Sequence, residues 1–276
     1  MRLKELLQEH SSAREIEKDY EDQLRWALTA LERCAGRPLT TDDFSPELVN
    51  HHIQCCRRKG MRDESRKSRL RNLLVLWHAA ADRGLAPEPP RRQIVRIKVA
   101  DRIPTAWTIA NVRILLGAAG MLHGTYRNGI AKSAYWQSYI RAAWDTGLRG
   151  VDLRRFRTDQ VAERVRLIQH KTGKRIRIGL QPLTLVAIHK TYPPQRDVVW
   201  PLWGRLELWR REAKKIVRRA GLRGGIGRLR HSSGTAFEIL HPQRGHEHLG
   251  NTRKVFEAHY LDVELIGGDV EMPEEL

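Results

Sequence analysis

A proline-rich stretch divides this chain about a third of the way along its length. Residues 86–92 read Ala-Pro-Glu-Pro-Pro-Arg-Arg, and neither a helix nor a central strand continues through prolines at that spacing. An alternating basic segment follows as far as Pro104. We interpret residues 86–106 as an extended interdomain linker. The expected organisation is an N-terminal extension (1–11), a small domain (12–85), the linker, and a larger domain (107–276).

The small domain is predicted to be helical. Apolar residues recur at helical spacing over 12–34, a Ser-Pro-Glu start signals a second helix over 45–58, and a third is predicted over 63–83. The third helix has an apolar stripe on one face. Its other face carries four basic side chains: Arg66, Lys67, Arg69 and Arg71. These residues are either a solvated surface or contacts to phosphate groups.

The larger domain has a mixed pattern. Helices are predicted from Thr108 and over 131–145, and most of the chain after residue 180 also has helical character. Short β-prone segments lie at 160–161, 164–168 and 175–178, and the turn between the last two contains Gly173. The expected fold class is therefore mainly α with a small β-sheet.

The charge of the chain predicts a polyanionic partner. The 276 residues carry a formal net charge of +18, and the basic residues are spread along most of the chain. A folded basic surface of this kind favours double-stranded DNA, with Arg91 and Arg92 of the linker as further phosphate contacts. No apolar run approaches the length of a membrane span, and no secretory signal opens the chain. We expect a cytoplasmic, nucleoid-associated protein that makes no membrane contact.

The cysteines predict neither a disulfide framework nor a metal site. The chain has three of them, Cys34, Cys55 and Cys56, and no second Cys/His pair completes a zinc spacing. His51 and His52 are close to Cys55 in the sequence, but neighbours on one segment make a poor tetrahedral site. We expect all three cysteines to be small buried residues.

Three residues of the larger domain have side chains suited to chemistry on a phosphodiester. A tyrosine such as Tyr260 can attack phosphorus, and the guanidinium groups of Arg149 and Arg230 can hold the non-bridging oxygens. Each also has an ordinary interpretation: Tyr260 as a core or rim residue, Arg149 as a helix-end cation, and Arg230 as surface charge. Likewise Lys171 and Asn251 are common residue types in turns.

Four motifs, taken together, resemble the tyrosine recombinases, also called the phage integrase family. The resemblance covers residues from about 12 to 262. The motifs stand in the order of that family: Thr-Gly-Leu-Arg-Gly-Val-Asp-Leu over 146–153, His-Lys-Thr-Gly-Lys over 170–174, Leu-Arg-His-Ser-Ser-Gly-Thr-Ala over 229–236, and Leu-Gly-Asn over 249–251 with Tyr260 following. Each motif is weak alone, and their co-occurrence carries the assignment.

The resemblance implies a fold and a reaction. Residues 12–85 would be a helical core-binding domain and 107–276 a mixed α+β catalytic domain, acting as a homotetramer on paired DNA sites. The reaction would be site-specific recombination through a 3′-phosphotyrosyl intermediate, and it would need neither metal nor cofactor. Phage integration, mobile-element transposition and dimer resolution remain open as biological roles.

The resemblance also implies a role for each site residue. Tyr260 would be the nucleophile, with Arg149 and Arg230 holding the phosphate oxygens. The hairpin lysine, Lys171, would protonate the leaving 5′ oxygen. Asn251 takes a position that more often holds histidine or tryptophan, and Asp152 would orient Arg149.

The chain departs from the family at Gly227. Members usually have histidine or lysine three residues before the second arginine, and glycine supplies neither a proton nor a charge. Arg228, His231 and His259 are the candidates to compensate. We expect an active but slower enzyme, because acid–base groups contribute about 10²–10⁴-fold. The alternatives are a catalytically impaired, integrase-like DNA-binding protein, a type IB topoisomerase, and a basic structural or RNA-binding protein.

Overall fold

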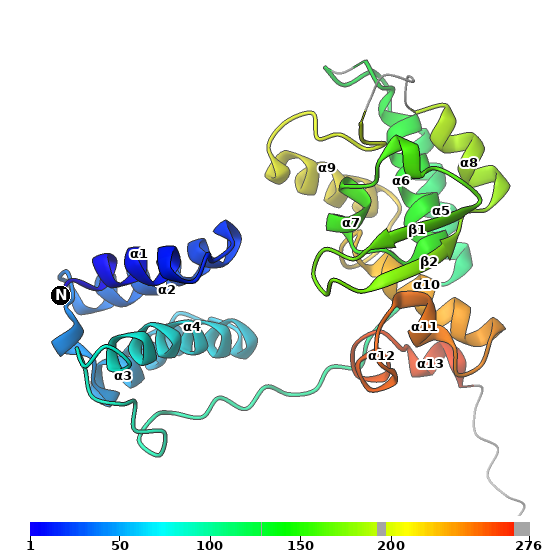
Figure 1. Ribbon diagram of the computed structural model, residues 1–276. Coiled ribbons are helices and arrows are strands. Elements are labelled where there is room, and N and C mark those ends of the chain that lie inside the picture. The colour runs from blue at the N-terminus through cyan, green and yellow to red at the C-terminus, as the bar shows by residue number, and fades with distance from the viewer. Residues whose placement is uncertain (128, 192–196, 268–276) are drawn as a thin grey trace, which may run out of the picture. The chain divides into compact units, whose positions relative to one another are not determined.

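The chain forms two compact units in a computed structural model that describes residues 1–127, 129–191 and 197–267 (Figure 1). The first unit is Met1–Asp101 and the second is Arg102–Leu276. The division falls inside the expected linker, and the end of the expected catalytic domain, 268–276, lies outside the described residues. Each unit has its own apolar core, as expected for two domains of this size.

The first unit is entirely helical in its regular structure. Its elements are α1 (Leu3–Ala13), α2 (Lys18–Ala35), the short 3₁₀ turn η1 (Thr41–Asp43), α3 (Pro46–Arg58) and α4 (Asp63–Ala81). Their inward faces form one core, in which Trp77 stacks on Phe44 with ring centroids 5.3 Å apart. Pro46 and the Ser45 side chain start α3 as predicted, because the Ser45 hydroxyl accepts a hydrogen bond from the Leu48 backbone.

The start of the chain differs from the sequence prediction. Residues 1–11 were expected to be an extension, with a first helix from residue 12, but α1 begins at Leu3. Leu3 and Leu6 have no exposed surface and belong to the core. The helix stops before Glu15, which adopts φ +46°, so α1 and α2 are separate elements. The single helix predicted over 12–34 was therefore wrong at its start.

The expected linker also belongs in part to the first unit. The side chain of Asn50 on α3 donates to the carbonyl of Gln93 at 2.8 Å and accepts from the backbone N–H of Val95 at 2.9 Å. The indole of Trp77 donates to the carbonyl of Pro87 at 2.7 Å. These bonds attach residues 87–95 to the helices. The prolines prevent this segment from forming a helix, so its backbone groups bond to side chains of α3 and α4 instead.

The second unit combines many helices with one small sheet. Its helices are α5 (Ile109–Gly120), α6 (Lys132–Thr146), α7 (Gly150–Arg154), α8 (Pro182–His189), α9 (Leu206–Arg219), α10 (Arg228–Leu240), α11 (Gly245–Leu249), α12 (Arg253–His259) and α13 (Val263–Ile266), with the 3₁₀ turn η2 at Thr158–Gln160. Helix α6 packs against α5, α8 and α10. Its buried face is strongly aromatic, and the polar tips are satisfied: Trp209 donates to the Tyr135 hydroxyl and Trp200 to the Ser138 hydroxyl, each at 3.0 Å.

The sheet is the predicted hairpin. Strands β1 (Arg164–Ile168) and β2 (Arg175–Gly179) pair antiparallel, with Arg164 opposite Gly179 and Ile168 opposite Arg175. Gly173 in the turn has φ +62°, as its sequence position suggested. The β-prone segment at 160–161 was wrong, because residues 158–160 form η2 instead. Among the described residues, no helix is both long and apolar enough to cross a membrane.

Gly147 is the point where α6 meets the C-terminal helices. It ends α6 with φ +57°, and a Cβ placed there would lie 2.4 Å from a methyl carbon of Leu249. The close approach brings the segment before α7 against the end of α11. Only a residue without a side chain permits both the left-handed backbone and this contact.

We predict that Gly147→Ala destabilises the second unit more than Gly173→Ala does. Both positions have positive φ, but a Cβ at Gly173 meets nothing within 4 Å. Gly173→Ala should cost about 1–2 kcal/mol of backbone strain, and Gly147→Ala should add about 1–3 kcal/mol of overpacking. Urea unfolding of the two variants measures the difference, and equal losses would show that the Leu249 contact relaxes freely.

Candidate active site

Arg230 is a buried cation whose hydrogen-bond partners are neutral. It lies in the first turn of α10, and only 5% of its surface is exposed. Its two terminal nitrogens donate to backbone carbonyls, Nη1 to Gly147 at 2.5 Å and Nη2 to Leu249 at 2.9 Å. Its Nε is buried with no hydrogen-bond partner among the described residues. Burial lowers the pKa of Arg230, and a bound anion would offset that loss of solvation.

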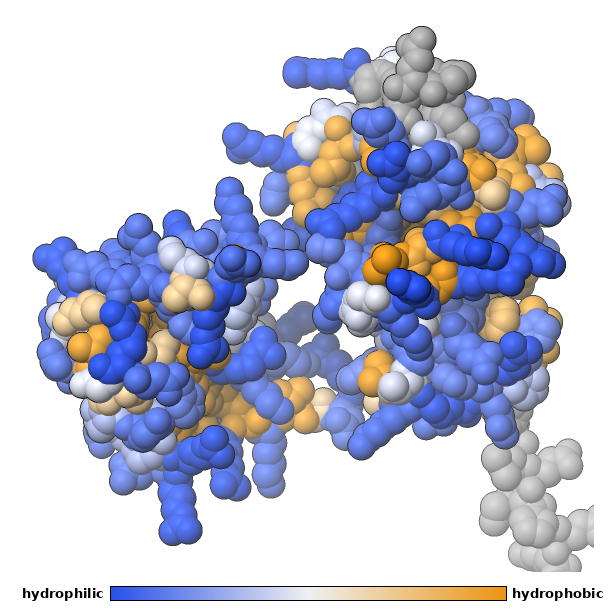
Figure 2. All heavy atoms as spheres, viewed as in Figure 1, coloured by the Kyte–Doolittle hydropathy of each residue, from blue (hydrophilic) through white to orange (hydrophobic). Residues whose placement is uncertain are grey.

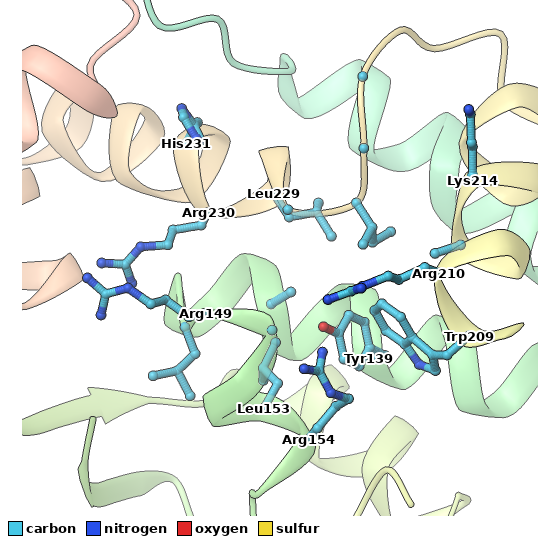
Figure 3. A pocket seen from close by; sticks show the side chains of 18 of the residues that line it. Tyr139, Arg149, Leu153, Arg154, Trp209, Arg210, Lys214, Leu229, Arg230 and His231 are labelled. Carbon is cyan, nitrogen blue, oxygen red and sulfur yellow. The ribbon is translucent and has the colours of Figure 1, made fainter. Parts of the chain in front are cut away.

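Arg149 is held beside Arg230 by the side chain of Asn251. Its Nη2 donates to Asn251 Oδ1 at 3.4 Å, and the same oxygen accepts from Arg230 Nη2 at 3.3 Å. Figure 3 shows the two guanidinium groups together at one end of a cavity of about 620 Å³. A single neutral oxygen therefore bridges two like charges. Two guanidinium groups that converge on one cavity can bind a tetrahedral oxyanion such as phosphate.

Tyr260 lies against this arginine pair. The guanidinium carbon of Arg230 is 4.8 Å from the centre of the tyrosine ring, and Tyr260 lines the same cavity. Burial alone would raise the pKa of Tyr260. The charges and hydrogen bonds of Arg230 and Arg149 outweigh burial, so the pKa lies below its ordinary value. A phenol that ionises more readily is a better nucleophile near neutral pH.

The segment that carries Tyr260 is tied to α10. The Thr235 hydroxyl donates to the carbonyl of Tyr260 at 3.2 Å and accepts from the backbone N–H of Asp262, also at 3.2 Å. Asp262 in turn accepts from the backbone N–H of Ala106 at 2.7 Å. Helix α10 therefore positions both Arg230 and Tyr260.

Gln169 is a site residue that the sequence analysis missed. It follows β1 and has no exposed surface. Its Oε1 accepts from Arg149 Nη1 at 3.0 Å, and its Nε2 donates to the carbonyl of Leu249 at 3.0 Å. It thus joins the hairpin to Arg149 directly and to the Leu249 carbonyl, which also accepts from Arg230. Nothing in its sequence context distinguishes it from a turn residue, and only the fold places it there.

Lys171 is at the tip of the hairpin, two residues after Gln169. It is exposed, and no hydrogen bond or ion pair among the described residues joins it to the two arginines. The structure brings together Arg149, Arg230, Asn251 and Tyr260, and Lys171 does not line the cavity that they share. The role of Lys171 stays a prediction.

Asp152 has a different partner from the one expected. It was expected to orient Arg149, but its Oδ1 accepts a 2.8 Å hydrogen bond from the backbone N–H of His170. Its Oδ2 is buried without a hydrogen-bond partner among the described residues. Asp152 therefore fastens the hairpin to α7, and Gln169 makes the contact to Arg149. Its charge acts through space on Arg230, whose pKa it raises against the larger, lowering effect of burial.

Of the three compensating candidates, His231 packs its ring against that of Tyr260. The two ring centroids are 5.0 Å apart, and Nδ1 of His231 is buried with no partner among the described residues. Burial, followed by the charges of Arg228 and Arg230, lowers the pKa of His231, so the imidazole is neutral at pH 7. Arg228 instead lies over the ring of Trp107, at 5.9 Å.

Gly227 leaves open space rather than a tightly filled position. It precedes α10 with φ −62°, and a Cβ there would meet nothing within 4 Å. A side chain at this position would therefore be tolerated by the backbone and its surroundings. The glycine is not required by the fold.

The four basic residues of α4 do not form one uniform face. Arg66 pairs with Asp63, and Arg69 Nη1 lies 3.3 Å from the Cys56 sulfur. The other two are exposed and line a groove of about 800 Å³ between α4 and residues 89–99, together with Arg91. Arg92 is exposed but does not line that groove. Lys67, Arg71 and Arg91 are thus the expected DNA contacts that share one concave surface.

Comparison with known proteins identifies the fold. No family profile and no curated protein sequence matches the chain. Among solved structures, a lambda integrase dimer bound to a COC′ core site superposes with a TM-score of 0.75 at 16% identity, over 100% of this chain and 81% of that one. The Tn1549 transposon integrase in complex with circular intermediate DNA gives 0.66 at 12% identity, over 95% of each chain. The XerH recombinase bound to a palindromic difH substrate gives 0.59 at 15% identity, over 79% and 67%.

The chain has the tyrosine-recombinase fold. The resemblance stated from four sequence motifs is thereby confirmed at the level of fold, and so is the mainly α class with its small sheet. Within this tyrosine-recombinase fold, the motifs far apart in the sequence converge on Asn251 and Gln169. That convergence is a property of this chain's own contacts and does not depend on the low sequence identity.

We predict that Arg230→Gln raises the pKa of Tyr260 by about one to three pH units. An opposite charge at this range typically shifts a pKa by that amount, and its removal leaves burial opposed by Arg149 alone. NMR of ¹³Cζ-labelled tyrosine measures the titration, with Tyr260→Phe assigning the signal. Arg210→Gln is the matched control, because Arg210 is an exposed arginine at the opposite end of the same cavity (Figure 3). A shift of equal size in both variants would contradict the assignment.

Proposed function

We propose that this chain is a site-specific DNA recombinase of the integrase type, which cuts and rejoins strands through Tyr260. The observation that carries the proposal is the pair Arg149 and Arg230, held at a neutral oxygen beside a tyrosine of lowered pKa. Cations without a bonded carboxylate, next to a nucleophile, are suited to a phosphodiester. The fold and the charge of +18 support DNA as the source of that phosphate.

The reaction follows from the positions of these groups. The Tyr260 oxygen attacks phosphorus, the bond to the 5′ oxygen breaks, and a 3′-phosphotyrosyl bond forms. Arg149 and Arg230 balance the charge on the non-bridging oxygens as it is rearranged. Because the new ester retains the energy of the broken one, attack by a 5′ hydroxyl reverses the step and rejoins a strand. No outside energy source enters the balance.

Two protons must move in the cleavage step. The tyrosine loses one, and we assign its acceptor as the neutral imidazole of His231, whose ring lies against Tyr260. The leaving 5′ oxygen gains one, and Lys171 at the hairpin tip is the proposed donor. The hairpin is anchored by Gln169 and by the Asp152 contact to His170, so the site and the lysine share a support.

The remaining surface suits a duplex. Hydrophilic residues cover most of the face shown in Figure 2, and we assign Lys67, Arg71 and Arg91 of the first unit as phosphate contacts. Four copies would act on two duplexes, since a lambda integrase tetramer bound to a Holliday junction has the same fold, with a TM-score of 0.71. Such an enzyme would work at the nucleoid in the cytoplasm.

A second function has one observation in its favour. Gly227 leaves no acid–base group at the position where the family usually has one. A protein with that gap could occupy DNA without cutting it. The two proposals differ in a single product, the covalent protein–DNA adduct.

We predict that the chain forms this adduct on a nicked suicide substrate. The substrate carries the attachment site identified from repeats flanking the gene, and loss of the short 5′ fragment prevents religation. Tyr260→Phe should abolish the denaturant-resistant adduct, because phenylalanine has no nucleophilic oxygen. Its DNA affinity should stay within a few-fold of the wild type.

The controls separate cutting from binding. Tyr20→Phe removes a tyrosine hydroxyl from the first unit and should leave the adduct yield unchanged. Binding with no adduct would refute the recombinase and favour the DNA-binding alternative. An adduct that persists in Tyr260→Phe would mean that another residue is the nucleophile, and relaxation of supercoils without recombinants would identify a topoisomerase.

We further predict that Gly227→His accelerates cleavage by about 10²-fold or more, the lower range for a general acid–base group. A Cβ at this position meets nothing within 4 Å, so the backbone there admits a side chain. Gly225→His is the matched control, since a Cβ there also meets nothing within 4 Å. Single-turnover adduct formation measures both rates. Equal rates in the wild type and Gly227→His would show that the site does not lack a proton carrier.

A further inference from the structure

Three potential metal ligands meet on the surface of the first unit, in a cluster unrelated to the candidate active site. They are Cys34 near the end of α2, and His51 and Cys55 on α3. Their ligand atoms all lie within 4.8 Å of one another, and Cys55 Sγ is 3.4 Å from His51 Nε2. All three cysteines were expected to be buried, but Cys34 and Cys55 are both partly exposed.

The fold builds this cluster from two helices. His51 and Cys55 are one turn apart, so their side chains lie on the same face of α3. Cys34 is in the last turn of α2, just before Gly36 ends that helix with φ +73°. Because α2 packs against α3, the third ligand comes from a segment distant in sequence. His51 and Cys55 alone had suggested a poor site, because they lie on one segment. The packing of α2 against α3 adds Cys34 as a third ligand.

The spacing of Cys55 and His51 is compatible with a thiophilic metal. In a tetrahedral zinc site, bonds of about 2.3 Å to sulfur and about 2.0 Å to nitrogen place these two atoms roughly 3.6 Å apart. The observed sulfur–nitrogen distance of 3.4 Å is close to that value. Two thiolates and one imidazole are also ligand types that select zinc over magnesium or calcium.

The surrounding charges favour the ligand state that zinc requires. Arg58 Nη2 lies 3.1 Å from Cys55 Sγ. Two thiolates cancel the charge of one Zn²⁺, so the zinc-loaded site is neutral and does not repel Arg58.

Cys56 is a natural internal comparison. It is adjacent to Cys55 but lies on the buried side of α3, where its sulfur is 3.6 Å from His52 Nε2 and 3.3 Å from Arg69 Nη1. It does not belong to the cluster of three. The same helix therefore carries one cysteine–histidine pair turned to the core and one turned to the surface.

We propose that Cys34, His51 and Cys55 bind one zinc ion, with the fourth coordination position open to water. The ion fastens the C-terminal end of α2 to the middle of α3. Through the neighbouring contact of Cys56 with Arg69, α3 also supports α4. The site is a structural clip on the first unit, and its existence does not depend on the recombinase activity.

The test is a zinc titration of the full chain, reduced, free of any tag and stripped of metal. Competition with a chromogenic zinc chelator should give one ion per chain. Cys34→Ser, Cys55→Ser and His51→Ala should each weaken binding more than about tenfold, the lower end of the loss caused by changing even a residue outside the ligand shell. Cys56→Ala is the matched control and should bind as the wild type does.

Cobalt substitution supplies a readout that a general loss of stability does not imitate. Co²⁺ should produce a thiolate-to-metal charge-transfer band that is roughly halved in each Cys→Ser variant, in proportion to the thiolates bound. Zinc should also raise the melting temperature of the wild type and not of Cys55→Ser. Failure of the reduced chain to bind zinc would overturn the proposal. Spontaneous formation of a Cys34–Cys55 disulfide, with no zinc bound after reduction, would identify a redox pair instead.

Discussion

The candidate site depends on one unusual contact, an amide oxygen shared by two guanidinium groups. Asn251 Oδ1 accepts from both Arg149 and Arg230, and no described carboxylate makes a hydrogen bond to either arginine. A carboxylate in its place would cancel half of the charge of the pair and compete with any incoming phosphate. An amide holds the geometry and leaves the positive charge available. The cost is a buried, poorly solvated cation at Arg230, and binding of an anion removes that cost.

This contact requires backbone segments to approach one another closely. Gly147 offers its carbonyl to Arg230 and permits the approach of Leu249. Gly250 ends α11 with φ +65°, and a Cβ there would lie 2.8 Å from Ile176 on the hairpin. Gly250 directly precedes Asn251, and Gly147 is two residues before Arg149. The geometry of the arginine pair therefore depends on these two glycines as well as on the side chains that bond to the arginines.

The parts of this structure that sequence reasoning reached are those specified locally. The hairpin followed from β-branched residues around a glycine turn, and α3 from its serine and proline start. The parts it missed depend on partners far away in the chain. Gln169 reads as a turn residue until Leu249 and Arg149 surround it.

The same limit explains the two errors in the first unit and the unexpected cysteine cluster. Helix α1 is short, and its burial comes from packing against α2 and α4 rather than from a long periodic pattern. The backbone of residues 87–95 is ordered by Asn50, a residue on a helix that precedes it by many positions. Cys34 meets His51 only because two helices pack side by side. Propensity cannot carry such information, because the contacts are made by tertiary structure.

The missing acid–base group at Gly227 affects the two proton transfers unequally. A factor of 10²–10⁴ corresponds to about 3–5 kcal/mol of transition-state stabilisation. On the nucleophile side, part of that stabilisation is replaced. Arg230 and Arg149 already lower the pKa of Tyr260, so a weaker base is sufficient to take its proton.

In the proposed mechanism no comparable help reaches the leaving 5′ oxygen, whose proposed proton donor is Lys171 at the tip of the hairpin. In that mechanism, departure of the 5′ oxygen limits the rate of cleavage, and attack by the tyrosine does not. The proposed mechanism therefore depends most on the hairpin, which the Gln169 and Asp152 contacts hold in place.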